Sequence, residues 1–238
     1  MRSETITYNV AMLPRAAHLI LLPVLLLGLP ACGEQAVELE PGRPAVPRDR
    51  PEEGPLVVFV GDSLSAGLGL SGEPPFPERS GDLLRERGVA ARIVNAGVSG
   101  DTTAGGLERL PWLLRQNPGI VVIELGANDG LRGLPLGMVR DNLERMIGAA
   151  RAGGADVLLL GMQIPPSYGQ SYAAGFAAIY TDLARELEVE LVDDFLAGVG
   201  GRAAMNLPDG LHPNGPGHRR LAENIVPALQ RLIERRER

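Results

Sequence analysis

The sequence predicts an α/β fold in which a parallel sheet has helices on both of its faces. Short apolar runs of strand length recur along the chain, and Leu56–Val60 and Ile120–Leu125 are the clearest of them. Such continuous apolar runs are typical of strands buried on both faces. Segments of helix length separate the runs, and polar loops rich in glycine follow several of them. This alternation predicts parallel strands joined by right-handed crossovers.

Five segments are expected to be strands because they are short and rich in Val, Ile and Leu. They are residues 56–60, 91–94, 120–125, 156–160 and 190–192. Longer segments between them are expected to be helices. Gly88 stops the first helix, Pro111 interrupts or kinks the second, and Gly153-Gly154 stops the third. The expected helices cover residues 77–87, 103–116, 135–152, 172–188 and 215–235.

Composition excludes several classes of protein. The chain has 238 residues and a formal net charge of −6, which argues against nonspecific nucleic-acid binding. It has no lysine, so a phosphate-binding loop of the Gly-Lys-Ser/Thr type is impossible. Its single cysteine, Cys32, excludes an intramolecular disulfide and a cysteine-based zinc cluster.

The first 33 residues are expected to be a targeting segment. Arg15 and His18 precede the apolar run Leu19–Leu29, which is too short to span a bilayer but suits a signal peptide. The run ends in Leu-Pro-Ala-Cys-Gly, which resembles a bacterial lipobox with Cys32 as the lipidated residue. Ordinary cleavage nearby, or retention as an anchor, is the alternative. Either Met1 or Met12 could be the start.

The remaining chain divides into a linker and a domain. Residues 34–55 are rich in Pro, Glu and Arg and have too few apolar residues to bury a core. Residues 56–238 are expected to form the domain. The protein is expected to be exported to the periplasm or cell envelope and held on a bacterial membrane by its N-terminal lipid. Its oligomeric state cannot be predicted from the sequence.

Candidate catalytic residues lie at both ends of the domain. Ser63 follows the first strand, at the sheet edge where open α/β folds bind ligands. His212 lies three residues after Asp209, a spacing that lets the carboxylate orient the imidazole. An ordinary turn with an incidental histidine explains this pair equally well. His218 begins the last helix beside two arginines and is expected at the surface.

Three groups could stabilise an oxyanion: the backbone N–H groups of Ser63 and Gly100 and the side-chain amide of Asn128. Turn formation is the simpler explanation for Gly100 and Asn128. A flavin site of the flavodoxin type also stays open at this stage. Only 4% of the residues are aromatic, however, so few rings are available to stack on a flavin.

Four short blocks together resemble the SGNH (GDSL) hydrolase superfamily. They are Gly61-Asp62-Ser63-Leu64, Gly100, Asn128 and Asp209-x-x-His212. The longer stretches GDSLSAG, SGDTTAGGLERLP, ELGANDGLRG and MQIPPSYG resemble its bacterial periplasmic arylesterase, thioesterase and lysophospholipase branch. Ala127 departs from that branch, which often has a second glycine there. The resemblance implies a flavodoxin-like, three-layer α/β/α sandwich with a five-stranded parallel sheet.

The resemblance also implies roles for residues. Ser63 is the nucleophile, His212 is the general base, and Asp209 orients His212. The N–H groups of Ser63 and Gly100 and the amide of Asn128 form the oxyanion hole, and no metal or cofactor is needed. Three acidic residues are expected to organise loops rather than react, namely Asp62, Glu124 and Asp129.

Substrate expectations rest on the segment 162–169, whose residues Ile164, Pro165 and Tyr168 would form one wall of an acyl site. The expected substrates are small acyl esters, thioesters or lysolipids. Two alternatives remain. One keeps the same machinery for O-acetylated sugars or peptidoglycan. The other is a non-catalytic lipid- or glycan-binding lipoprotein, which would be expected to lack part of the catalytic set.

Overall fold

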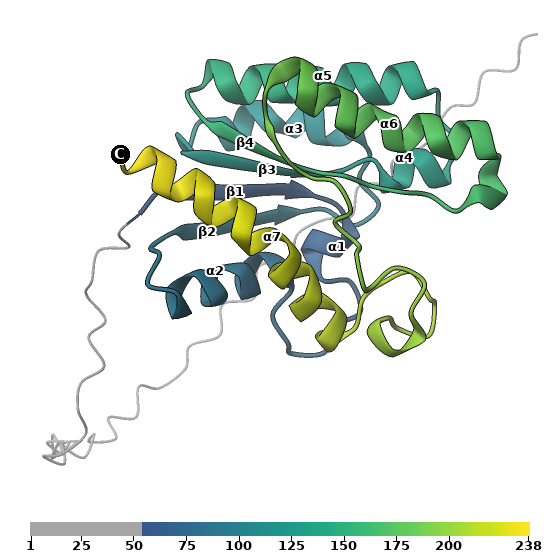
Figure 1. Ribbon diagram of the computed structural model, residues 1–238, viewed down its shortest axis with the longest axis horizontal. Coiled ribbons are helices and arrows are strands. Elements are labelled where there is room, and N and C mark those ends of the chain that lie inside the picture. Colours follow the sequence, from purple (N-terminus) through teal and green to yellow (C-terminus); the bar gives the residue numbers. More distant parts are fainter. Residues whose placement is uncertain (1–53) are drawn as a thin grey trace, which may run out of the picture. The chain divides into compact units, whose positions relative to one another are not determined.

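A computed structural model describes residues 54–238, which form a parallel sheet between two layers of helices (Figure 1). The strands are β1 (Leu56–Gly61), β2 (Arg92–Gly97), β3 (Ile120–Glu124), β4 (Asp156–Leu160) and β5 (Glu190–Val192). The five strands lie in the order β2-β1-β3-β4-β5, and every neighbouring pair is parallel. The chain runs from β1 outward to β2 and then returns past β1 to β3. This reversal makes the carboxyl ends of β1 and β3 the place where such a sheet binds ligands.

The helices lie on the two faces of the sheet. Helices α2 and α7 pack together on one face, and α5 packs against both α3 and α6 on the other (Figure 1). The α-helices are α1 (Ser63–Ala66), α2 (Phe76–Glu86), α3 (Thr103–Leu114), α4 (Ala127–Leu131), α5 (Leu136–Ala152), α6 (Gln170–Leu187) and α7 (Gly215–Arg236). Two 3-10 turns, η1 (Pro166–Tyr168) and η2 (Ala203–Met205), complete the elements. The three-layer fold with a five-stranded parallel sheet is confirmed.

The core is aliphatic, with a few rings at its centre. All residues of β1 and β3 are buried, as their apolar sequences predict. The ring of Phe76 packs 5.7 Å from that of Phe59 and 5.0 Å from that of Phe195, between centroids. This cluster joins β1, α2 and the segment after β5. Burial of the two central strands is therefore what holds their carboxyl ends in register.

The structure corrects several local expectations. Ser63 and Asn128 begin or lie within short helices, α1 and α4, where the sequence predicted loops. Strand β2 extends to Gly97 instead of ending at residue 94, because it pairs with β1 along its whole length. Helix α3 continues through Pro111 without interruption. Pro111 is exposed, so its ring is accommodated at the surface.

His218 is buried, so its expected place at the surface was wrong. Only 1% of its surface is exposed, and its Nδ1 accepts a hydrogen bond from the Phe76 backbone N–H at 3.2 Å. Its ring stacks on that of Phe76. The contact between α2 and α7 explains the burial, since His218 lies in the first turn of α7. Burial, assisted by the charge of Arg79, lowers the pKa of His218 to about 4.

The targeting segment, the lipidation at Cys32 and the linker up to Glu53 lie outside the described residues. They remain predictions. Within residues 54–238, no helix is both long enough and apolar enough to cross a bilayer.

The buried His218 should make the protein less stable in acid. Because the folded state keeps this ring neutral, the unfolded chain binds one more proton between the ordinary pKa of 6.5 and the folded value of about 4. The free energy of unfolding should therefore fall as the pH falls through this window, by up to about 3 kcal/mol. In His218→Asn, the amide oxygen can still accept from Phe76 but does not titrate. Urea unfolding at about pH 7 and about pH 4 should show that the free energy of unfolding falls less in the variant than in the wild type. Equal losses for both proteins would contradict the assignment.

Candidate active site

Three side chains from distant parts of the chain form a hydrogen-bonded row at the carboxyl edge of the sheet. The Ser63 Oγ lies 3.0 Å from His212 Nε2, although 149 positions separate the two residues. The His212 Nδ1 lies 2.7 Å from Asp209 Oδ2. The imidazole is thus positioned to take a proton from the serine hydroxyl while the carboxylate holds its other nitrogen.

The end of β1 positions Ser63. Asp62 follows the strand and caps α1, its Oδ1 accepting from the Leu64 backbone N–H at 2.9 Å. Ser63 is therefore the first residue of a helix. Gly61 is required before it, because a β-carbon there would lie 2.0 Å from the Ser65 hydroxyl. This tight strand-to-helix turn presents the Ser63 side chain toward His212.

A closed loop before α7 carries the other two members of the row. The Oδ1 of Asp209 accepts from the backbone N–H groups of Leu211 and His212 at 2.9 and 3.0 Å. The loop is closed where the Leu207 N–H donates to the His212 carbonyl at 2.7 Å. The hydrogen bonds from the His212 backbone and ring and from the Leu211 backbone lower the pKa of Asp209 to about 2. Asp209 is therefore an ionised partner for the imidazole at neutral pH.

Two of the predicted oxyanion donors are backbone N–H groups. Gly100 is the third residue of a turn in which the Asp101 N–H donates to the Val98 carbonyl at 3.0 Å. Its φ of +81° is the value that a type II turn requires at this position, and it favours glycine. Within residues 54–238, the N–H groups of Gly100 and Ser63 have no recorded acceptor. Both can therefore donate to a ligand.

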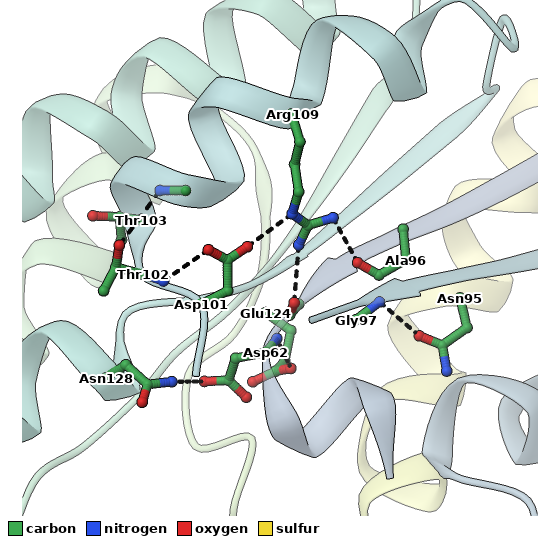
Figure 2. A network of polar contacts seen from close by, with 12 residues as sticks. Asp62, Asn95, Ala96, Gly97, Asp101, Thr102, Thr103, Arg109, Glu124 and Asn128 are labelled. Atoms are coloured by element: carbon green, nitrogen blue, oxygen red, sulfur yellow. Dashed lines mark hydrogen bonds and ion pairs between the residues drawn. The ribbon is translucent and has the colours of Figure 1, made fainter. Parts of the chain in front are cut away.

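Asn128 supplies the third predicted donor from α4. Its Nδ2 donates to Asp62 Oδ2 at 3.0 Å, and the second hydrogen of the amide remains for a ligand (Figure 2). The preceding Gly126 has a φ of +121°, and a β-carbon there would meet the Tyr180 hydroxyl at 2.0 Å. Asp62 therefore links the turn that carries Ser63 to the helix that carries Asn128.

The carboxyl group of Glu124 lies buried beneath the turn that carries Ser63. Its Oε2 accepts from the Asp62 N–H at 3.1 Å, the Ser65 N–H at 3.2 Å and the Ser65 hydroxyl at 2.7 Å. Complete burial, reinforced by the charge of Asp62, raises the pKa of Glu124 well above its usual range. Burial also raises the pKa of Asp62 to about 6. Glu124 is therefore the neutral member of the pair, and both residues organise the turn as the sequence analysis expected.

Asp129 likewise organises the site. Its carboxylate accepts from the Thr103 hydroxyl at 2.6 Å and from the Thr103 N–H at 2.9 Å, which joins α4 to the start of α3. Arg109, to which the sequence assigned no role, reaches from α3 to the carboxyl ends of β1 and β2. The family-like stretch SGDTTAGGLERLP contains Arg109, but its partners Gly61 and Ala96 lie outside that stretch, so the sequence did not indicate its role.

The predicted acyl wall is only partly at the surface. Ile164 is buried, and its side chain packs close to Gly130 of α4. Pro165 and Tyr168 are exposed on the segment that leads into α6. Other apolar side chains, which the sequence analysis missed, are exposed on the loops that carry the reactive groups. They are Leu68 after α1, Val98 in the Gly100 turn and Leu211 beside His212. Exposed apolar side chains on the loops around Ser63, Gly100 and His212 suit an apolar ligand.

Comparisons with known proteins point to one family. Residues 59–220 match the GDSL-like Lipase/Acylhydrolase family. The chain is 47% identical over 178 residues to esterase TesA of Pseudomonas aeruginosa, covering 74% of this chain and 89% of that protein. It is 36% identical over 178 residues to thioesterase 1/protease 1/lysophospholipase L1 of Escherichia coli strain K12, and the match covers 74% of this chain and 84% of that protein. A crystal structure of TesA, 47% identical, superimposes with a TM-score of 0.71 and covers 74% of this chain and 98% of that one.

The buried Glu124 should make stability depend on pH in the direction opposite to His218. The unfolded chain loses the Glu124 proton above its ordinary pKa of 4.5, whereas the folded protein keeps it to higher pH. Glu124 therefore lowers the free energy of unfolding as the pH rises through this window, with a limiting slope of about 1.4 kcal/mol per pH unit. Glu124→Gln keeps a neutral acceptor for the turn but does not titrate. Urea unfolding from about pH 5 to about pH 8 should show the variant gaining stability relative to the wild type. Parallel curves would rule out a neutral Glu124.

Proposed function

Because this chain belongs to the GDSL-like lipase/acylhydrolase family, we propose that it is an esterase whose nucleophile is Ser63. The row of hydrogen bonds from Ser63 through His212 to Asp209 carries this proposal. A serine hydroxyl is a weak nucleophile until a base removes its proton, and this row supplies the base. One relative is named an esterase and another thioesterase 1/protease 1/lysophospholipase L1, which supports an ester or thioester as the bond that is cleaved.

The reaction begins at the carbonyl carbon of the substrate. Ser63 Oγ attacks this carbon while His212 Nε2 takes the hydroxyl proton, and Asp209 stabilises the resulting imidazolium. The carbonyl oxygen becomes an oxyanion that accepts from the N–H groups of Ser63 and Gly100 and from the Asn128 amide. A single donor of this kind contributes about 10²–10³ in kcat.

Collapse of the intermediate breaks the bond to the leaving alcohol or thiol, which receives the proton from His212. The acyl group then remains on Ser63. Water attacks the acyl carbon while His212 Nε2 takes a proton from it. The bond between the acyl carbon and Ser63 Oγ then breaks, Oγ takes the proton back from His212, and the carboxylic acid is released. Glu124 and Asp62 hold the turn throughout and exchange no atoms with the substrate.

The substrate class follows from the surface around Ser63. Leu68, Val98 and Leu211 expose apolar side chains on three loops of the site, which suits an acyl chain better than a sugar. We therefore propose short- or medium-chain acyl esters, thioesters or lysolipids as substrates. Tyr168, exposed at the end of η1, is proposed as part of the same acyl-binding surface.

Labelling with a fluorophosphonate tests the nucleophile. Peptide mapping should find a single adduct, on Ser63, which is lost in Ser63→Ala and strongly reduced in His212→Ala. Both variants should lower kcat for a p-nitrophenyl ester by several orders of magnitude, as removal of a triad member does. Stability measured by urea unfolding should change little, since neither side chain is in the core. A folded wild-type protein that takes up no label would overturn the proposal.

We also propose that Cys32 carries a lipid that tethers the domain to a bacterial membrane. The lipobox-like sequence that ends at Cys32 supports this proposal. A single acyl chain binds a membrane only marginally, so a stable tether needs more than one chain, as lipoproteins have. Cys32→Ser, expressed in a bacterium, should lose its acyl mass on intact-mass analysis and move from the membrane to the soluble fraction. Its esterase activity should be unchanged. Retention of the acyl mass in the variant would contradict lipidation at this residue.

A further inference from the structure

Arg109 projects from α3 and donates three hydrogen bonds, to the ends of β1 and β2 and to Asp101 (Figure 2). Its Nη2 donates to the Gly61 carbonyl at 2.9 Å and its Nη1 to the Ala96 carbonyl at 2.6 Å. Its Nε donates to Asp101 Oδ2 at 2.7 Å. One guanidinium thus joins the ends of β1 and β2 to the residue that follows Gly100.

The bond to Gly61 connects Arg109 to the nucleophile. Gly61 is the last residue of β1 and lies two positions before Ser63. Its carbonyl accepts a second hydrogen bond, from the Val98 N–H at 3.0 Å. Val98 is the first residue of the turn that contains Gly100. The start of that turn is therefore attached to the same carbonyl that Arg109 holds.

The bond to Asp101 connects Arg109 to the end of the same turn. Asp101 is the last turn residue, and its Oδ1 also accepts from the Thr102 N–H at 3.0 Å. Its carboxylate lies against Gly105 of α3, where a β-carbon would come within 1.9 Å of Oδ1. Arg109 and Gly61 thus hold both ends of the turn. The direction of the Gly100 N–H relative to Ser63 depends on these contacts.

The chemistry of the side chain matches this arrangement. The exposed fractions of the Arg109 and Asp101 side chains are 22% and 11%, so solvent screens their contact only weakly. A planar guanidinium can direct separate donors to three acceptors, whereas the single ammonium group of lysine cannot reproduce that fork. A lysine paired with Asp101 alone would leave the carbonyls of Gly61 and Ala96 without the hydrogen bonds that Arg109 donates to them.

We propose that Arg109 is a positioning residue for ester hydrolysis, which sets the Gly100 N–H at the distance from Ser63 that the oxyanion needs. The inference rests on the proposed function, because it assigns Gly100 as an oxyanion donor and Ser63 as the nucleophile. Arg109 itself exchanges no proton with the substrate. Its loss should weaken binding of the transition state and leave binding of the neutral ester nearly unchanged.

The test compares Arg109→Lys with a matched control, Arg79→Lys. Arg79 is similarly buried, with 20% of its side chain exposed, and also donates to a carboxylate and a backbone carbonyl, those of Glu73 and Pro74. Fluorophosphonate labelling run to completion counts the competent serines in each protein. The values of kcat per labelled site and KM for a p-nitrophenyl ester are then measured. Inhibition by a trifluoromethyl ketone, which forms a tetrahedral adduct with an oxyanion, gives a further readout.

Arg109→Lys should lower kcat per labelled site by about 10²-fold, the cost of misplacing a reacting group by about 1 Å. It should weaken trifluoromethyl ketone binding by a similar factor and leave KM nearly unchanged. Arg79→Lys should change none of these values. If Arg109→Lys does not fold, Asp101→Asn weakens the hold on the same turn and can replace it. This variant should likewise lower kcat per labelled site and leave KM nearly unchanged.

Unchanged kcat per labelled site in a folded Arg109→Lys would overturn this inference. So would a rise in KM that accounts for the whole loss of kcat/KM. Failure of the wild type to take up label would instead overturn the proposed nucleophile, so the two failures are distinguishable.

Discussion

The pairing of β1 with β3 is the constraint on which the site depends. In this parallel pair Gly61 lies opposite Glu124, and this register places the Glu124 carboxyl directly beneath the turn that carries Ser63. The carboxyl then accepts from two backbone N–H groups of the turn and from the Ser65 hydroxyl. A shift of one residue would turn every side chain of the strand to the opposite face and remove this support. Burial of both strands prevents such a shift.

The carboxyl groups around Ser63 differ in pKa because their surroundings differ. Asp209 accepts backbone and imidazole hydrogen bonds near the surface, and its lowered pKa keeps it charged beside His212. Glu124 is enclosed in the core, and burial raises its pKa. Separating the pKa values of nearby acids is a general means of giving them separate roles. In the proposed mechanism the charged Asp209 supports proton transfer by His212, whereas the neutral Glu124 holds the backbone of the turn that carries Ser63.

Ser63 and Asn128, the proposed nucleophile and one proposed oxyanion donor, are positioned by similar local structures. Each lies at the start of a short helix that follows a buried strand, α1 after β1 and α4 after β3. The first N–H groups of a helix have no partner within it, so the Ser63 N–H is available to a ligand, whereas Asn128 offers its side-chain amide. Glycine is needed just before each helix, because Gly61 and Gly126 approach Ser65 and Tyr180 too closely for a β-carbon. The turn that contains Gly100 would provide the remaining proposed donor, its N–H group, and Arg109 links this turn to β1.

The sequence by itself determined the class of fold and the chemical groups of the site. Strands such as Ile120–Glu124 and Asp156–Leu160 were predictable because buried parallel strands are continuously apolar. The blocks containing Ser63, Gly100, Asn128 and Asp209-x-x-His212 could be singled out by residue type, and their resemblance to a known family is what implied their roles.

Only the tertiary structure decided the contacts between distant segments. The 3.0 Å contact of Ser63 with His212, the burial of His218 between α2 and α7, and the three partners of Arg109 all depend on how the elements pack. The short helices α1 and α4 also escaped prediction, because capping by Asp62 and close packing around Gly126 determine them more than helix propensity does. Local pattern reports which face of a segment is apolar, but not which distant residue will cover it.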